Sequence, residues 1–384
     1  MVQMLGLGAI GAVAGGWIKR RVPVLDRLNI PAPIVGGMIY ALIALALRDR
    51  VVNLEADAAL RDLLQIAFFT TIGLSVRMED LRRGGAALAW LLGAASVGAM
   101  LQNVLGMALA RGMGIDPRIG ILAGSVSLAG GPATSLVFGR EFERMGVQGA
   151  TTVAVASATF GIAVSGLIGG YIGGWLIRRH RLVAAGAKQA IGFAPPRESG
   201  GSLMTAVVVV AVSMGLGSLV SAGLQGLGVI LPATIGAMIA AAVVRGVVDR
   251  YGFAQVSQAD VNQIGHISLY LFIVMALVAL RLWELAYLAG PMLVLLAAQV
   301  VLCWMMCVTL AFWVMGRDYD AAVGAGGFCG FMLGITPNAV AVMNELVEKH
   351  GPAPRAFLVV PVVGGFLVDF VNSLLITAMA NWVR

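Results

Sequence analysis

One acidic residue lies in the middle of a long apolar stretch near the end of the chain. It is Asp369, in Phe366-Leu-Val-Asp-Phe-Val-Asn-Ser373, and Asn372 follows three residues later. On a helix these two side chains share a face. A carboxylate at membrane depth costs at least about 2.5 kcal/mol unless it faces a cavity or a partner. The pair of oxygens suits a hard cation such as sodium, or a proton relay; packing against a neighbouring helix is the alternative.

Two glycine-rich clusters, each with a proline, have the composition of an anion site. They read Gly124-Ser-Val-Ser-Leu-Ala-Gly-Gly-Pro-Ala-Thr-Ser135 and Gly326-Gly-Phe-Cys-Gly-Phe-Met-Leu-Gly-Ile-Thr-Pro-Asn338. Glycine permits a sharp turn, and proline suits the first turn of the helix that follows. The amides at such a helix start attract a carboxylate without a buried arginine, and freed carbonyls and hydroxyls could hold sodium. Close packing of small residues is the alternative.

The substrate-binding candidates belong to these two clusters. They are Ser127, Gly130, Gly131, Pro132, Ala133, Thr134, Ser135, Gly334, Thr336, Pro337 and Asn338. Gln102, Asn103 and Gln299 also lie inside apolar stretches, where they indicate either a polar interior or structural hydrogen bonds between helices.

A membrane protein is needed to position these residues. The chain is 59% hydrophobic and 12% charged, with a mean hydropathy of +0.92, whereas soluble domains carry about 25% charge. Lipid must therefore surround most of the surface. We predict ten transmembrane helices, because a span needs about 20 apolar residues. They cover residues 2–18, 30–47, 63–76, 85–110, 149–177, 203–222, 229–244, 264–280, 291–315 and 356–383.

The two clusters interrupt this pattern at 119–139 and 321–343. We predict that both are re-entrant hairpins, because irregular backbone inside a membrane requires protein or a cavity around it.

The chain divides into two similar halves, 1–178 and 203–384, joined by a basic, proline-containing linker at 179–202. Short matches recur in order at an offset of about two hundred residues, and five spans in each half place the halves in opposite orientations. We therefore predict an all-α polytopic fold of two inverted five-helix repeats, each with one glycine-rich hairpin. The matches include Arg77–Leu81 with Arg281–Leu285, Pro132 with Pro337, and Gly146 with Gly351.

The basic residues indicate topology rather than a nucleic-acid partner. The net charge is +7, but the basic side chains form short clusters between apolar runs instead of one stripe. Most of them face the cytoplasm if both termini are periplasmic and the linker is cytoplasmic. This arrangement places Arg245 in a cytoplasmic loop.

Eight short stretches, spread in order over almost the whole chain, carry a family resemblance. They are Ile30–Gly37, Ala67–Leu74, Leu122–Ser125, Ala158–Gly161, Leu282–Leu285, Tyr319–Val323, Phe357–Pro361 and Val368–Asn372. In them the chain resembles the glutamate:sodium symporter family of bacteria.

The resemblance implies a multi-pass protein of the bacterial inner membrane. It implies sodium-driven uptake of glutamate or a related small carboxylate, with Na⁺ as the coupling ion and no organic cofactor, and a homodimer with an elevator-type motion. Thr71 and Thr159 lie in the similar stretches and join Asp369 and Asn372 as candidates for sodium coupling.

The chain departs from the family pattern at the hairpin tips. The first tip reads Gly-Gly-Pro-Ala-Thr-Ser (130–135), where family members carry Gly-Gly-His-Gly-Thr-Gly. In the second, Asn338 and Val340 replace Thr and Ile, and Phe328 stands where His is common. The tips are expected to contact the substrate, so the exact carboxylate stays open.

Other classes of protein fit the sequence less well. An intramembrane aspartyl protease needs two aspartates, whereas only Asp369 lies deep in a predicted span, and serine chemistry lacks a buried histidine. A channel lined by charge rings would carry more than one buried ionisable group per chain. We therefore predict a transporter and not an enzyme, with proton coupling through Asp369 as the alternative to sodium.

Overall fold

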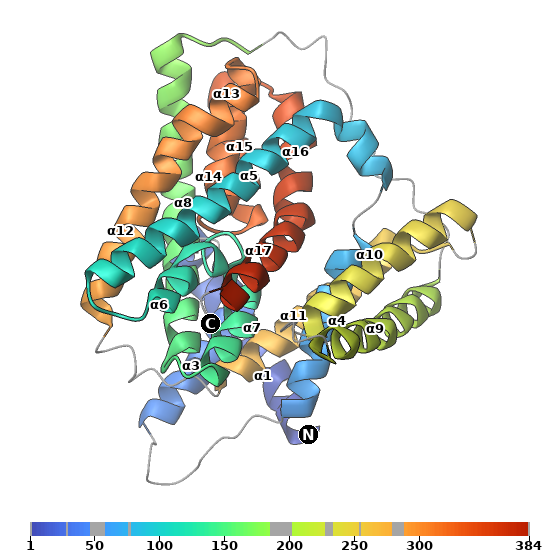
Figure 1. The fold of residues 1–384 in the computed structure, drawn as a ribbon. Coiled ribbons are helices and arrows are strands. Elements are labelled where there is room, and N and C mark those ends of the chain that lie inside the picture. Colours follow the sequence, from blue (N-terminus) through green and yellow to red (C-terminus); the bar gives the residue numbers. More distant parts are fainter. Residues whose placement is uncertain are drawn as a thin grey trace. The chain divides into compact units, whose positions relative to one another are not determined.

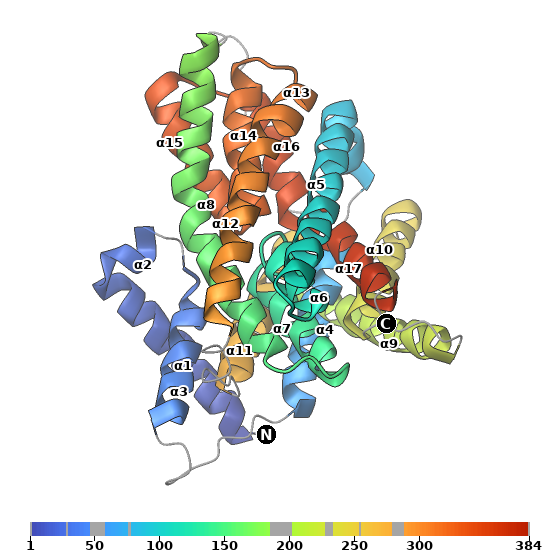
Figure 2. The ribbon, with the colours of Figure 1, turned by 60° about the vertical axis from the view of Figure 1, so that its left-hand side comes forward.

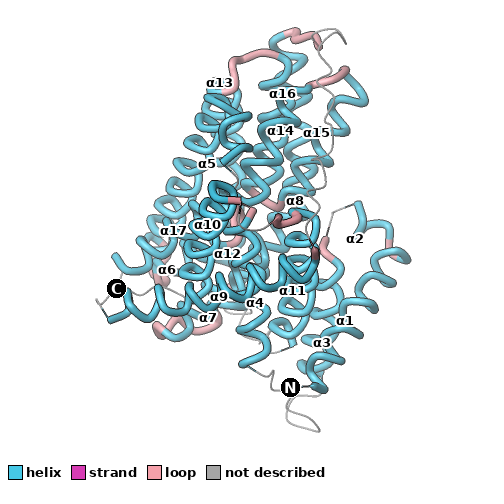
Figure 3. Tube along the Cα trace, turned by 90° about the vertical axis from the view of Figure 1, so that its right-hand side faces the viewer, coloured by secondary structure: helices cyan, strands magenta, loops and turns pink. Residues whose placement is uncertain are grey.

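The protein is all-helical throughout the part of the chain that is described. The computed structural model describes residues 2–27, 30–46, 58–75, 78–184, 202–226, 233–252, 255–278 and 288–382. Helices and connecting loops account for all of these residues, and no strand occurs among them (Figure 3). This confirms the all-α class predicted from the sequence.

Each of the ten predicted spans corresponds to a helix or to consecutive helices. These are α1 (Val2–Arg21), α3 (Ala32–Ala46), α4 (Ala58–Leu74), α5 (Met78–Gly112), α8 (Ala150–His180), α9 (Leu203–Gly226), α10 (Ala233–Tyr251), α11 (Gln258–Val278), the run α12–η4–α13 (Ala289–Met306, Cys307–Ala311, Phe312–Val314) and the run α16–η5–α17 (Pro354–Val362, Val363–Leu367, Val368–Trp382). A short helix, α2 (Pro23–Arg27), follows α1.

Six helical segments among the described residues are long and apolar enough to cross a membrane. They are Gly85–Gly112, Ala150–His180, Leu203–Gly223, Gln258–Val278, Ala289–Val314 and Pro354–Asn381. The chain is thus a membrane protein, and the full count of ten spans stays a prediction.

The chain forms two compact units that interleave along the sequence. Unit 1 comprises Met1–Met78, Ala194–Ala286 and Thr377–Arg384, and unit 2 comprises Glu79–Phe193 and Tyr287–Ile376. Each unit therefore draws segments from both halves of the sequence. The predicted inverted repeats are a statement about which segments have the same fold, and the division into units does not test it. The repeats therefore stay a prediction. Residues 185–201 of the predicted linker lie outside the described residues.

Unit 1 is built on two pairs of helices that approach each other through glycine. A methyl group at Gly36 of α3 would lie 1.8 Å from the carbonyl oxygen of Gly11 in α1. Likewise, a methyl group at Gly217 of α9 would lie 2.1 Å from the Cα of Ala237 in α10, and α9 and α10 run side by side (Figures 1 and 2). Such small residues let membrane helices pack backbone to backbone.

The same unit pairs helices across the two halves of the sequence. Helix α3 packs against α11, and α10 packs against α4. At the second contact, a methyl group at Gly73 would lie 2.2 Å from the carbonyl oxygen of Met238. Counted by predicted spans, the third span of each half (α4, α11) thus packs against the second span of the other half (α10, α3).

Arg245 lies in α10 and not in the loop that we predicted. Its side chain is 4% exposed, and its Nε is 2.9 Å from Oδ1 of Asp249 one turn later. The helix continues to Tyr251. The ion pair with Asp249 on the same helix face neutralises the buried charge of Arg245. A hydropathy pattern alone does not reveal such a pair.

Unit 2 contains both of the predicted hairpin regions. The first consists of α6 (Pro117–Ile121), the π-helical segment η1 (Leu122–Val126), a turn at 127–130 and α7 (Gly131–Arg144). The second consists of α14 (Tyr319–Met332), a turn at 333–335 and α15 (Thr336–His350). We call them hairpin 1 and hairpin 2. Both turns fall inside the glycine-rich clusters.

Helix α8 contacts both hairpins and holds unit 2 together. It packs along α7 and also along α14 and α15. Its contact with α14 is again glycine-lined, since a methyl group at Gly169 would lie 2.8 Å from the carbonyl oxygen of Gly326. In Figures 1 and 2, α8, α12 and α14 run beside each other in this unit.

Candidate functional site

The tips of the two hairpins meet inside unit 2. Gly131, the first residue of α7, has a φ of +65°, in the left-handed region that favours glycine. A methyl group at Gly131 would lie 3.1 Å from Cγ2 of Ile335 and 3.9 Å from the carbonyl oxygen of Gly334. The turn of hairpin 1 is therefore in contact with the turn of hairpin 2.

The helices that leave the two tips begin without a side-chain cap. The residues before α7 and α15, Gly130 and Ile335, provide no side-chain cap, and each helix has a proline in its first turn, Pro132 and Pro337. In contrast, the helices that enter the hairpins are capped, by Asp116 and Asp318. An uncapped helix start carries a partial positive charge and amides that face outward. Two such helix starts lie next to each other at the tips.

Hairpin 1 is held at its tip by its own hydroxyl groups. Ser127 donates a hydrogen bond to the carbonyl oxygen of Leu122. Ser135 lies 2.8 Å from the carbonyl oxygen of Gly131 and 3.1 Å from Oγ of Ser127. These bonds link the turn to the first turn of α7. Ala133 and Thr134 are buried beside them, whereas Gly130 is half-buried.

Hairpin 2 is held at its tip by neighbouring helices. Nδ2 of Asn338 donates to the carbonyl oxygen of Ile162 at 2.6 Å and to Oγ of Ser165 at 2.7 Å, both on α8. Oγ1 of Thr336 donates to the carbonyl oxygen of Gly364 in η5 at 2.6 Å. Both amide hydrogens of Asn338 are thereby used, and its buried Oδ1 has no partner among the described residues. Asn338 presents an acceptor only.

Asp369 and Asn372 lie on α17, and Asn372 contacts hairpin 1. Nδ2 of Asn372 donates to the carbonyl oxygen of Ser125 at 2.9 Å, which leaves its buried Oδ1 without a partner in the described part of the chain. The Asp369 side chain makes neither a hydrogen bond nor an ion pair with a described residue. The hydroxyl oxygen of Ser125 is also buried and unpartnered there. Unsatisfied oxygens thus gather where α17 meets η1.

Three buried amide side chains support the backbone of the hairpins, two of them directly and one through α5. Nε2 of Gln102 donates to the carbonyl oxygen of Met332 at the end of α14, at 2.9 Å. Nε2 of Gln299 donates in turn to the carbonyl oxygen of Gln102 at 2.7 Å. Oδ1 of Asn103 accepts from the amide of Ser125 at 2.9 Å. These amides support the tips, which is the structural alternative weighed for them from the sequence.

Thr71 and Thr159 bond within their own helices. Oγ1 of Thr71 donates to the carbonyl oxygen of Phe68 in α4, and Oγ1 of Thr159 donates to that of Val155 in α8. Thr71 belongs to unit 1, whereas Thr159 belongs to unit 2 with the hairpins. Each hydroxyl keeps acceptor capacity for a further ligand.

The sequence analysis missed two residues that hold the hairpin 2 tip, Ser165 and Gly364. Their only signal in the sequence was a polar or glycine residue inside an apolar span.

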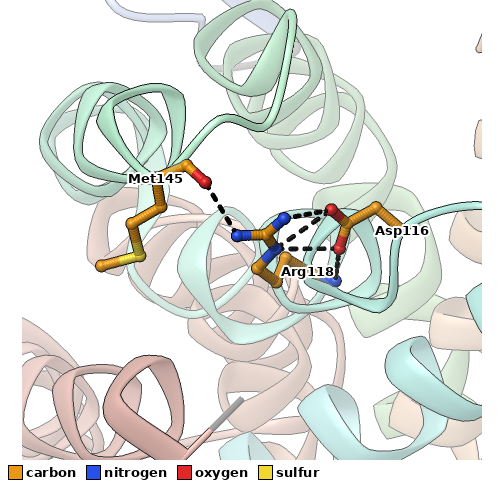
Figure 4. A network of polar contacts seen from close by, with 3 residues as sticks. All are labelled: Asp116, Arg118 and Met145. Atoms are coloured by element: carbon orange, nitrogen blue, oxygen red, sulfur yellow. Dashed lines mark hydrogen bonds and ion pairs between the residues drawn. The ribbon is translucent and has the colours of Figure 1, made fainter. Parts of the chain in front are cut away.

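The base of hairpin 1 is closed by an ion pair (Figure 4). Asp116 caps α6 by accepting from the amide of Arg118, and its Oδ2 lies 2.6 Å from Nη2 of the same arginine. Arg118 also donates to the carbonyl oxygen of Met145, just past the end of α7, at 3.0 Å. The start of the first arm is thus tied to the end of the second. The hydrogen bond from Arg118 lowers the pKa of Asp116.

The base of hairpin 2 is closed by different residues. Tyr319 donates from its hydroxyl to the carbonyl oxygen of Gly351, just past the end of α15. Arg355 pairs with Asp318 at 2.7 Å and also donates to the carbonyl oxygen of Met315. Burial, with the nearby charge of Asp320, raises the pKa of Tyr319 and keeps its hydroxyl a donor. Both hairpins are therefore closed at the base and meet at the tip.

The family described as "Sodium/glutamate symporter" matches residues 2–352 of this chain. The chain belongs to the sodium/glutamate symporter family. The family resemblance found in the sequence is thus confirmed, and this member of the sodium/glutamate symporter family is a membrane transporter and not an enzyme.

Bacterial relatives match almost the full length of this sodium/glutamate symporter family member. The "Sodium/glutamate symporter" of Escherichia coli (strain K12) is 38% identical over 372 residues, covering 94% of this chain and 92% of that protein. The protein of the same description from Haemophilus influenzae (strain ATCC 51907 / DSM 11121 / KW20 / Rd) is 34% identical over 386 residues, covering 97% and 95%. A solved sodium proton antiporter from Methanocaldococcus jannaschii aligns at 14% identity with a TM-score of 0.44, over 100% of this chain and 98% of that one.

Proposed function

We propose that this protein is a sodium-coupled symporter that takes up glutamate or a related small carboxylate, and that both ligands bind in unit 2 at the hairpin tips. The observation that carries the proposal is the meeting of two uncapped helix starts at Gly131 and Ile335, in a chain whose relatives are described as sodium/glutamate symporters.

The helix starts suit the carboxylate of the substrate. The tip sequences 127–135 and 333–338 contain no lysine or arginine, so a bound anion would rely on backbone amides and helix dipoles. Ser127, Thr134, Ser135 and Thr336 add hydroxyl groups at the same place. The acceptor-only Oδ1 of Asn338 suits a donor group on the substrate, such as an ammonium.

The unsatisfied oxygens near α17 suit sodium. Hard cations take oxygen ligands from carboxylates, amides and carbonyls. Oδ1 of Asn372 and Oγ of Ser125 are such oxygens, and the carboxylate of Asp369 lies in the first turn of the same helix, α17. Sodium there would neutralise a carboxylate that otherwise lies without a partner among the described residues. Binding of the cation and of the anion would be linked because Asn372 bonds the first arm of hairpin 1.

The interleaved units support the transport mechanism that we infer. Unit 2 carries both hairpins and is packed through α8, so it can move as one body with its ligands, as an elevator-type mechanism requires. The glycine contacts of α1 with α3 and of α9 with α10 support two inverted repeats with re-entrant hairpins. We propose further that the protein is a homodimer of the bacterial inner membrane with both termini periplasmic.

Sodium dependence of uptake tests the coupling role of Asp369. In proteoliposomes, Asp369→Asn should raise the half-saturating sodium concentration more than tenfold while changing the affinity for substrate less, because the helix starts remain. Asp260→Asn on α11, a half-buried carboxylate in unit 1, is the matched control and should behave as wild type. An unchanged sodium response in Asp369→Asn would remove this residue from the coupling site.

The same preparation separates the alternatives. Uptake that follows a pH gradient and ignores sodium would replace the sodium proposal with proton coupling. A panel of amino acids and dicarboxylates as competitors would identify the carboxylate, and failure of all of them to compete or to be transported would refute the substrate class.

A further inference from the structure

The three cysteines of the chain, far apart in sequence, come together in unit 2. Cys303 lies on α12, Cys307 starts η4 and Cys329 lies on α14, the first arm of hairpin 2. All three are free thiols and are fully buried. Their sulfur atoms lie within 4.8 Å of one another, with 4.0 Å between those of Cys303 and Cys329.

This spacing is close to that of sulfurs around a single metal centre. Thiolates bind zinc at about 2.3 Å, which holds two sulfurs on one centre at most about 4 Å apart. The pair Cys303–Cys329 already has this separation, and the sulfur of Cys307 lies within 4.8 Å of both. Thiols are soft ligands that select soft centres.

The apolar interior around the three thiols favours a bound centre whose charge balances that of the thiolates. Three thiolates carry three negative charges, and a net charge buried in an apolar interior is costly. A monovalent ion would leave two negative charges and a divalent ion one, whereas a trivalent centre gives a neutral site. A centre that arrives as a neutral molecule also avoids carrying a charge across the apolar shell.

We propose that Cys303, Cys307 and Cys329 form a binding site for a soft trivalent metalloid such as arsenic(III). Neutral arsenous acid, As(OH)₃, exchanges its three hydroxyl groups for the three thiols. Three As–O and three S–H bonds break, three As–S bonds form, and the protons leave with the hydroxyl groups as three water molecules. No electron is transferred, and the product has no net charge.

A bound metalloid would join the α12–η4 run to α14, the first arm of hairpin 2. Cys303 and Cys307 belong to the α12–η4 run, whereas Cys329 lies one turn before the end of α14, whose Met332 carbonyl bonds Gln102. A metalloid would thus cross-link the first arm of hairpin 2 to α12.

Arsenic bound to the purified full-length protein measures the proposal directly. After incubation with sodium arsenite and removal of free ligand, we expect about one arsenic per chain by mass spectrometry of the elements, with three sulfur neighbours by X-ray absorption. Cys329→Ala and Cys303→Ala should lower retention at least tenfold, and a dithiol chelator should release the metalloid from wild type. The variant lacking all three cysteines gives the background.

Several outcomes would overturn the proposal. Wild-type protein that retains no arsenic, or single variants that retain as much as wild type, would show that the thiols do not act together. Zinc retained as tightly as arsenic would refute the charge argument. Alanine variants are compared only as monodisperse protein, and Cys→Ser versions provide a second set if one fails to fold. Binding is measured without transport, so failure of the symporter proposal would not affect the result.

Discussion

The two hairpins of unit 2 reach similar backbone shapes through different interactions. Hairpin 1 is bonded at its tip by Ser127 and Ser135, which belong to the hairpin itself. Hairpin 2 is bonded by Asn338 and Thr336 to α8 and η5. The side chains at the tip of hairpin 1 therefore bond within the hairpin, although Asn103 and Asn372 hold its Ser125 backbone from outside. The polar side chains at the tip of hairpin 2 instead bond to neighbouring helices.

The bases of the hairpins differ in the same way. A single arginine, Arg118, joins the cap of hairpin 1 to its far end at Met145. In hairpin 2, Tyr319 closes the base and Arg355 ties Asp318 to the preceding segment. A carboxylate also caps the following helix in each case, since Glu143 accepts from the amide of Thr151 and Asp320 from that of Arg355. Both hairpins are thus closed at the base and followed by a capped helix, but different residues make these contacts.

The largest effect is expected from a methyl group at the hairpin 2 tip. In Gly334→Ala, the new carbon would lie 2.5 Å from Oγ of Ser165 and 2.9 Å from the carbonyl oxygen of Gly330, so the turn must shift. We expect uptake to fall more than tenfold. Gly131→Ala should lower it less, because the strain of its positive φ costs about 1–2 kcal/mol.

Gly166→Ala on α8 is the control for both changes, since nothing lies within 4 Å of the added methyl group. Uptake is measured per unit of folded protein. Normal uptake in both tip variants would show that the contact between the tips has no part in transport.

Asn338→Ala tests whether the external bonds of hairpin 2 matter more than the internal bonds of hairpin 1. The residue after the tip proline then becomes alanine in both hairpins, as at Ala133. The change removes the Asn338 donor from the hydroxyl of Ser165 and from the carbonyl of Ile162, which still accepts from Ser165, at a cost of about 1–3 kcal/mol. Ser135→Ala should cost about 1 kcal/mol or less. Thermal unfolding in detergent measures both, and equal losses would contradict the distinction.

The caps at the hairpin bases should have moderate and unequal effects. Removing an N-cap carboxylate costs about 1 kcal/mol. The loss of stability in Asp116→Ala should exceed that in Asp318→Ala, because the side chain of Asp116 is 31% exposed against 51% for Asp318. Melting temperatures of the two variants provide the measurement, and a larger loss in Asp318→Ala would reverse the comparison.

Acid should weaken the base of hairpin 1 by a small amount. The pKa of Asp116 lies below its ordinary value of 3.8 because of Arg118, so its stabilisation is present above that value and is lost as the pH falls through the lowered pKa. The pair is about a quarter to a third exposed, so the effect should stay below about 1 kcal/mol. Between about pH 5 and pH 3, wild type should lose slightly more stability than Asp116→Asn. Identical pH profiles would show that the pair contributes nothing.

Local chemistry in the sequence predicts the hairpin turns well. Pro132 and Pro337 stand in the first turns of α7 and α15, as the rule for proline at helix starts requires, and the glycine clusters contain the turns. The apolar runs likewise locate the helices. These features depend on neighbours in the chain, so the order of residues is sufficient to reveal them.

Contacts between distant segments could not be predicted in this way. Nothing near Asn338 in the sequence points to Ser165, and nothing near Cys303 points to Cys329. The prediction that Arg245 lies in a loop was wrong because the groups that compensate its charge lie one turn later, at Asp249, and on another helix, at Gln258. The interleaving of the two units also depends on contacts between segments that are far apart in the sequence.

This interleaving also has a consequence for how the protein is made. Unit 1 needs Met1–Met78 and Ala194–Ala286, so its early helices emerge about two hundred residues before their partners are complete. At about 5–20 residues per second, the delay is about 10–40 s. Throughout this delay, α3 and α4 present faces that α11 and α10 will later cover. A nascent chain arrested at residue 193 therefore contains neither unit whole, and its glycine-lined faces depend on lipid or the insertion machinery until synthesis resumes.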